Sequence, residues 1–248
     1  MGKKKAGEKK QKVSKAHVKA LKKVKPFKPR SARKTMVVQR PAKKDSKVGS
    51  KVLSTEELIA LLKPGRELEA KAEAWLKDLK GGMVTLWVAD LKNYADLNRF
   101  LIQYFLKKEM QGVYVTINRP FEDLVKGVQL QGAKGIQFVD MITLSSGGQA
   151  VKADNCMYLE SPVNLFELNE AVEKGLARVQ GEHRFLVVDA VSTLLIYNKP
   201  DEVEKLVHTL ASKARSMNAF TALLMVENQE NKGVLETLSQ FVDKVAWF

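Results

Sequence analysis

From residue 83 onward, short apolar runs alternate with longer segments in which apolar residues recur at helical spacing. The runs are rich in Val, Ile and Leu, and they predict strands at 83–89, 112–117, 136–142, 184–189, 221–226 and 245–248. The amphipathic segments predict helices at 94–108, 120–130, 164–179, 201–217 and 234–241. Strands that alternate with helices in this way form βαβ units. The pattern therefore predicts an α/β fold with a mostly parallel sheet covered by helices on both faces.

Two further helices are predicted ahead of the first strand, within residues 54–80. The first begins at a capping Ser54 or Thr55 and ends at a Pro-Gly pair, and the second ends at a Gly-Gly pair. Residues 143–156 contain consecutive serines followed by consecutive glycines, which predicts a loop. We therefore expect a core over residues 83–248, preceded by these two helices.

Charge divides the chain into two parts. Residues 1–51 hold 20 Lys and Arg against two acidic residues, a net charge of +18, whereas residues 52–248 hold 22 basic and 26 acidic residues, a net charge of −4. The first part also has few large apolar residues, so burial cannot offset the entropy of ordering it. We predict a disordered, Lys-rich basic arm at 1–51 and a folded α/β domain at 52–248.

Several classes of protein are disfavoured by composition. Cys156 is the only cysteine, so neither a disulfide framework nor a cysteine-rich zinc site is expected. The three histidines, His17, His183 and His208, are far apart in the sequence, and we predict no metal site. No apolar run approaches the roughly 20 residues of a membrane-spanning helix, and no apolar stretch of a secretory signal follows the charged start of the chain. We expect a soluble, cytoplasmic protein.

The basic arm predicts a polyanionic partner. Its lysines and arginines suit neutralisation of a phosphate backbone, so nucleic acid or a nucleoprotein is the first expectation. The alternatives are an acidic protein, an anionic membrane surface, or a tail that only confers solubility. The candidate nucleic-acid-binding residues are Lys3, Lys4, Lys5, Lys9, Lys10, Lys22, Lys23, Arg30, Arg33, Lys34, Arg40, Lys43 and Lys44.

Three stretches of the domain carry a resemblance to a known family. They are GVYVTINRPFEDLVKGVQLQG at 112–132, FLVVDAVSTLL at 185–195, and the segment from TALLMVENQENKG to LSQFVDKV at 221–245. In order and spacing they resemble the RecA-superfamily domain of KaiC-like and Rad55-like ATPases of the archaeal type. The resemblance covers about two-thirds of the chain, and it implies a three-layer RecA-like (P-loop NTPase-type) fold.

The phosphate-binding motif of that family is missing. Active members carry G-x-x-x-x-G-K-[ST] after the first strand, because glycines let backbone N–H groups wrap the phosphates and the Lys neutralises them. Here the turn reads ADLKNYADL at 89–97, without glycine and without a Lys-Ser or Lys-Thr pair. Asp90 and Asp96 would place negative charge beside a triphosphate, and Lys92 is not at the family position. The turn is expected to be an ordinary strand–helix connection with Asn93 as the N-cap.

The catalytic glutamates that the resemblance implies are also missing. Asn118 and Arg119 stand in their place, and neither is a competent general base near neutral pH. Asp189 matches the Walker B position, where it would hold Mg²⁺ through water, or else cap nearby backbone N–H groups. Ser192 and Thr193 are interpreted as a helix-capping cluster. We predict no catalytic residue and no cofactor.

Three functional hypotheses remain. The first is a non-catalytic pseudo-ATPase that acts as a binding or scaffolding protein through its basic arm. The second is a residual nucleotide binder or slow ATPase that uses Asp189 and an atypical loop. The third is a subunit that docks on an active RecA-like paralogue, or a homo-oligomer.

Overall fold

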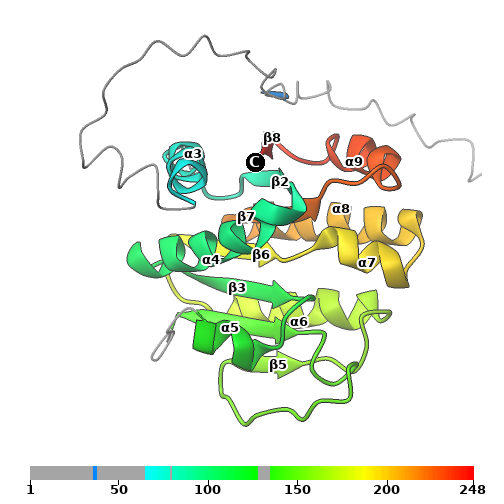
Figure 1. Ribbon diagram of the computed structural model, residues 1–248. Coiled ribbons are helices and arrows are strands. Elements are labelled where there is room, and N and C mark those ends of the chain that lie inside the picture. Colours follow the sequence, from blue (N-terminus) through cyan, green and yellow to red (C-terminus); the bar gives the residue numbers. More distant parts are fainter. Residues whose placement is uncertain (1–35, 38–64, 79, 128–134) are drawn as a thin grey trace, which may run out of the picture. The chain divides into compact units, whose positions relative to one another are not determined.

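The computed structural model describes residues 36–37, 65–78, 80–127 and 135–248, which all belong to one compact unit, Thr35–Phe248. Its eight strands form a single sheet in the order β1-β8-β2-β7-β6-β3-β4-β5, and every neighbouring pair is parallel (Figure 1). The strands are β1 (Met36–Val37), β2 (Val84–Ala89), β3 (Gln111–Thr116), β4 (Ile136–Asp140), β5 (Cys156–Tyr158), β6 (Arg184–Val188), β7 (Ala219–Val226) and β8 (Lys244–Trp247).

Helices cover both faces of this sheet. They are α3 (Arg66–Leu76), α4 (Leu91–Lys107), α5 (Phe121–Gly127), α6 (Leu165–Arg178), α7 (Val191–Tyr197), α8 (Pro200–Ser216) and α9 (Lys232–Leu238). Successive residues of a strand point to opposite faces, so Leu86 packs with the layer of α6, α7, α8 and α9, and Trp87 packs with the layer of α3, α4 and α5. The three-layer, parallel α/β architecture predicted from the sequence is confirmed.

The interior of the sheet agrees with the sequence pattern. β2, β3, β6 and β7 are flanked by other strands on both sides and buried along nearly their whole length. Their continuous apolar runs are typical of parallel strands that are covered on both faces. Close packing shows in the Phe105 ring, which stacks on Phe185 with 4.3 Å between ring centroids. Gly112 makes room for this stack, because a Cβ there would lie 2.2 Å from the carbonyl oxygen of Phe185.

Four local predictions are corrected or extended. α4 begins at Leu91 rather than at 94, so Asn93 lies within its first turn and is not the N-cap. β5 falls partly within the predicted 143–156 loop, and α7 follows β6 where only capping residues were expected. β1 lies within the range predicted to be a disordered arm. The rest of the arm and the helix predicted from Ser54 lie outside the described residues.

None of the helices in the described part of the chain combines the length and apolar character that crossing a membrane requires.

Candidate functional site

The carboxyl ends of the parallel strands bring Asp189 and other polar residues to one edge of the sheet. Asp90 follows β2, Asn118 follows β3, Asp189 follows β6, and Glu227 follows β7. Open α/β sheets bind ligands outside this edge, in the crevice where strand order reverses. These polar residues therefore share one edge of the sheet, and their chemistry depends on the contacts that each side chain makes.

The connection from β2 to α4 consists of one residue. β2 ends at Ala89 and α4 begins at Leu91, and the carbonyl oxygen of Asp90 accepts hydrogen bonds from the backbone N–H groups of Asn93 and Tyr94 at 3.0 Å each. Asp90 has extended backbone angles and no side-chain capping bond. A phosphate loop needs several free backbone N–H groups that curl around the anion. The single connecting residue leaves no loop to do this.

A small cavity lies beside this connection. Its volume is about 180 Å³, below the roughly 300 Å³ at which ligand pockets begin. Phe248 lines this cavity: its ring stacks on Trp87 with 4.8 Å between centroids, and the Lys71 ammonium lies 5.4 Å from the Phe248 ring centre. The cavity is lined by Lys71, Val88, Ala89, Asp90, Glu227, Trp247 and Phe248. The lining holds one ammonium, that of Lys71, beside the carboxyl groups of Asp90 and Glu227, so it offers a triphosphate no excess of positive charge.

Asp189 is buried beneath α4, with a relative exposure of 1%. Its Oδ1 accepts a hydrogen bond from Asn98 Nδ2 at 3.1 Å, and Asn98 Oδ1 in turn accepts one from the Tyr114 hydroxyl at 2.8 Å. The structure thus links Asp189 to a side chain of α4 rather than to the backbone N–H groups that it was predicted to cap. Burial raises the pKa of Asp189 to about 8, which disfavours the ionised carboxylate near neutral pH.

Asn118 and Arg119, which stand where the family has its catalytic glutamates, make structural hydrogen bonds. Asn118 Nδ2 donates to the Tyr94 hydroxyl at 3.1 Å, and Asn118 Oδ1 accepts a hydrogen bond from the Thr193 hydroxyl at 2.6 Å. Both ends of the amide are therefore engaged, and the residue joins the end of β3 to α4 and α7. Arg119 contributes its carbonyl oxygen, which accepts from the Thr116 hydroxyl.

Ser192 and Thr193 are not helix caps. Both lie inside α7, and each bonds to the end of a neighbouring strand. The Ser192 hydroxyl accepts a hydrogen bond from the backbone N–H of Val226 at 3.2 Å. Together with the hydrogen bond from Thr193 to Asn118, it connects α7 to the carboxyl edge of the sheet. The two hydroxyl groups therefore hold α7 against the ends of β7 and β3.

One polar residue at this edge was not predicted. Asp140 ends β4 with no exposed surface, and its carboxylate accepts hydrogen bonds from the backbone N–H groups of Phe121, Ile142 and Thr143 at 2.7 to 2.9 Å. The Thr143 hydroxyl adds a fourth at 2.6 Å. These bonds satisfy the backbone N–H groups at the start of α5 and in the turn after β4. The sequence signal was an aspartate directly after an apolar strand, the same signal that marks Asp189.

No metal centre emerges from the described residues, since they contain no group of three His, Cys, Asp or Glu that could hold an ion. Cys156 is half-buried, and burial raises the pKa of its thiol to about 12, so the thiol is unreactive at neutral pH. Glu230 is exposed in the polar loop after β7. All of the candidate nucleic-acid-binding lysines and arginines of the arm lie outside the described residues.

Known proteins that are similar to this chain are found among the solved structures. No protein-family model matches the chain, and a search of curated proteins gives no match. Among solved structures, the chain is similar to a KaiC-like protein of the hyperthermophilic archaeon Pyrococcus horikoshii, with 13% identity and a TM-score of 0.46 over 64% of this chain and 68% of that one. A second Pyrococcus horikoshii protein shares 14% identity, with a TM-score of 0.49 over 71% and 87% of the two chains. The all-parallel sheet with a helical layer on each face is the three-layer α/β architecture that the resemblance of the sequence implied.

Proposed function

We propose that this protein is a non-catalytic RecA-like scaffold of the cytoplasm, which engages nucleic acid or a nucleoprotein through its basic arm and does not hydrolyse ATP. The observation that carries the first half of the proposal is the burial of Asp189. A Walker B carboxylate must be ionised and open to the water shell of Mg²⁺. Asp189 is instead covered by α4 and bonded to Asn98, and its burial raises its pKa, which disfavours the ionised form.

Two further features support the loss of hydrolysis. The one-residue connection at Asp90 provides no cradle of N–H groups for phosphate, and its own carboxylate would repel one. Asn118 cannot accept a proton from an attacking water, and its amide nitrogen and oxygen each already make a hydrogen bond, to Tyr94 and from Thr193. Phosphate binding, metal binding and activation of water are thus each unsupported, and for separate reasons.

Isothermal titration of the full chain with Mg-ATP tests this half. We expect no heat that fits a dissociation constant below about 1 mM, which corresponds to a free energy near −4 kcal/mol. The matched control is Asp189→Ala, which should give the same trace as the wild type. A micromolar constant that is lost in Asp189→Ala would restore the residual-nucleotide hypothesis and overturn the proposal.

The second half depends on charge. The arm carries a net +18 beside a domain of net −4, so a polyanion should be attracted by the arm and repelled by the domain. Binding through phosphate contacts releases counterions and is therefore strongly salt-dependent and nearly independent of sequence. If the arm neutralises about six phosphates, affinity should fall about a thousandfold between roughly 50 and 200 mM salt.

Fluorescence anisotropy with a labelled RNA and a labelled DNA duplex tests this half. The variant replaces Lys3, Lys4, Lys5, Lys9, Lys10, Lys22 and Lys23 by Gln, and the control replaces an equal number of exposed domain lysines. We expect the arm variant to lose most of the affinity and the salt slope, and the control variant to retain both. Equal losses in both variants would contradict the assignment of binding to the arm. Absence of binding by the wild type would instead favour an acidic protein or a membrane surface.

A further inference from the structure

The net charge of −4 on the domain is distributed unevenly between the two edges of the sheet. The segments that lead into the interior strands β2, β3, β6 and β7 are 77–83, 107–110, 178–184 and 213–218. They hold eight Lys and Arg against three acidic residues, whereas the remainder of residues 52–248 holds 14 against 23. Because the strands are parallel, these segments meet at the amino edge of the sheet, opposite the candidate site. The amino edge is therefore basic, and the rest of the domain is acidic.

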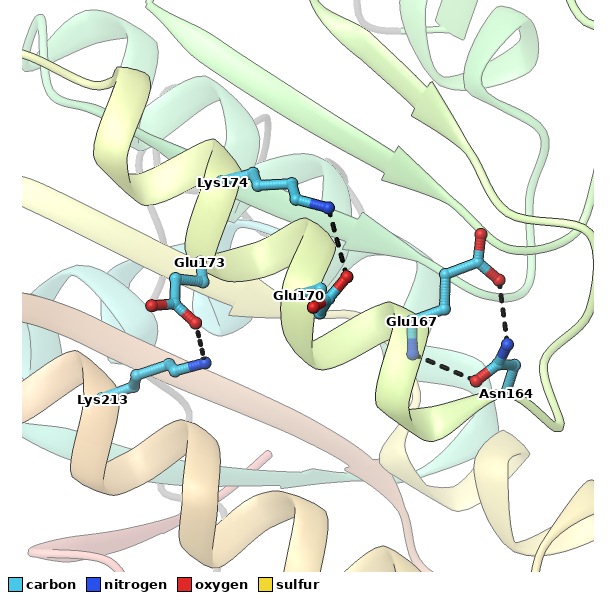
Figure 2. Close-up of polar contacts among 6 residues, drawn as sticks. All are labelled: Asn164, Glu167, Glu170, Glu173, Lys174 and Lys213. Carbon is cyan, nitrogen blue, oxygen red and sulfur yellow. Dashed lines mark hydrogen bonds and ion pairs between the residues drawn. The ribbon is translucent and has the colours of Figure 1, made fainter.

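Two of these eight cations are engaged inside the fold. The Lys213 ammonium reaches from α8 to Glu173 of α6, as Figure 2 shows, and a guanidinium nitrogen of Arg215 lies 3.3 Å from Asp243 Oδ2. The other six form no ion pair with a carboxylate in the described part of the chain. They are Lys77, Lys80, Lys107, Lys108, Arg178 and Arg184.

Helix ends account for four of these six cations. They lie in or next to the last turns of α3, α4 and α6, where a cation offsets the negative end of the helix dipole. Lys80, in the exposed loop after α3, and Arg184, the first residue of β6, belong to no helix end. Arg184 Nε donates to the carbonyl oxygen of Gly181 at 3.1 Å, and this bond orients the guanidinium. A structural role at a helix end therefore does not explain Lys80 and Arg184.

A polar hollow of about 570 Å³ lies in the middle of this amino edge, bounded by the loops before β2, β6 and β7. Arg184, His183 and Asn218 bring nitrogen donors to its lining, against one carboxylate, that of Glu182. Lys80 directly precedes the lining residue of the loop before β2. A guanidinium and an ammonium beside a hollow with further N–H donors suit a phosphate group, whose oxygens accept hydrogen bonds.

The basic arm joins the domain at this same edge. β1 is parallel to β8, so the chain enters β1 at Met36 from the amino edge, and the candidate cations from Lys3 to Lys34 precede it. Three strand spacings separate β1 from β7, which is about 14 Å at roughly 4.8 Å each. A DNA duplex covers that distance in about four base-pair steps of roughly 3.4 Å. A nucleic acid bound at the point where the arm is attached would therefore extend to the hollow.

We propose that the amino edge of the sheet is a second phosphate-binding surface, on which Lys80, Arg184 and the hollow between them bind a nucleic acid that the arm also holds. The inference rests on the proposed binding of nucleic acid and assigns to it a defined site on the domain. The acidic remainder of the domain repels the same ligand, so the charge distribution confines the ligand to this edge.

Fluorescence anisotropy of the full chain with a labelled RNA and a labelled DNA duplex tests the inference. The edge variant combines Lys80→Gln with Arg184→Gln. The control combines Lys92→Gln with Lys232→Gln, which removes the same charge from exposed lysines in the first turns of α4 and α9, at the opposite edge. Each phosphate contact contributes about 0.7–0.9 to the slope of log K against log salt concentration. The edge variant should therefore lower the slope by about 1.5–2 and weaken binding about tenfold or more at roughly 0.1 M salt, whereas the control should match the wild type.

The possible results separate this inference from the proposed function. If the wild type binds and the edge variant binds equally well, the amino edge is not a site and the role of the arm stands. Equal losses in the edge variant and the control would show an effect of net charge alone, which also overturns the inference. A wild type that binds neither probe overturns the proposed function and this inference with it. Circular dichroism checks that the variants are folded, and Lys80→Glu alone, in an exposed loop, should also weaken binding without altering Arg184. The domain lysines replaced in the arm experiment are chosen outside this edge.

Discussion

Replacing Asp189 by asparagine is expected to change how the stability of the protein depends on pH. The carboxyl is buried, and its pKa is raised from 3.8 to about 8 in the folded protein. A folded state with the higher pKa holds its proton more tightly than the unfolded state. The stability contributed by that proton is complete below pH 4 and is lost as pH rises to about 8. The amide introduced by the substitution has no such proton to lose, so the variant lacks this dependence.

The size of the effect follows from the pKa difference. Each pKa unit corresponds to about 1.4 kcal/mol, so the shift from 3.8 to about 8 amounts to about 6 kcal/mol over the whole window. Between pH 5 and pH 7, the wild type should lose about 3 kcal/mol relative to Asp189→Asn. For a domain of this size that equals a relative change in Tm of about 6–12 °C.

Thermal and urea unfolding at pH 5, 6, 7 and 8 measure this difference. The amide oxygen of the introduced side chain can still accept the hydrogen bond from Asn98, so the variant should fold, and at pH 7 it should be more stable than the wild type. Asp201→Asn is the control, because this exposed carboxylate pairs with Lys205 and its lowered pKa keeps it ionised from pH 5 to 8. If wild type and Asp189→Asn show parallel pH profiles, Asp189 is ionised in the folded protein and the reasoning fails.

Two other predictions concern packing and reactivity. Gly112→Ala should lower the free energy of unfolding by about 1–3 kcal/mol or more in urea titrations, because its Cβ would collide with Phe185. The control Gly127→Ala, whose Cβ has nothing within 4 Å, should be neutral. Equal effects of the two substitutions would contradict this account. Cys156 should be alkylated by iodoacetamide at pH 8 about a thousandfold more slowly in the folded protein than in urea, because burial raises the pKa of its thiol to about 12. Comparable rates in the two states would show that the folded protein has an accessible thiolate.

Strands with continuous apolar runs were predictable from the sequence, and so was the alternation of strands and helices. β5 was missed because three residues, CMY, give no periodicity, and its place at the sheet edge depends on backbone pairing with β4. α7 was missed because it is a single short helix, entered through Ala190 with a φ of 71°. Seven residues that follow a strand so closely do not display a helical repeat.

The candidate site was predicted in position but not in its contacts. Asp189 was singled out from its place after an apolar strand, whereas its partner Asn98 lies in the middle of a helix, 91 residues earlier. Polar residues at such positions are usually solvated, and only the packing of α4 on the sheet makes this one a buried donor. Whether the carboxyl is charged depends on the same packing, because the environment rather than the residue type sets its pKa.

The single residue between β2 and α4 also limits what this sheet edge could be redesigned to do. Substitutions at Asp90, Lys92 and Asn93 could supply the glycines and the lysine of a phosphate site, but they would leave position 90 as the only one available for the turn. A loop that wraps an anion must first be several residues long, because several backbone N–H groups have to point at the anion. Conversion of this protein into a nucleotide binder would therefore take an insertion of several residues between β2 and α4.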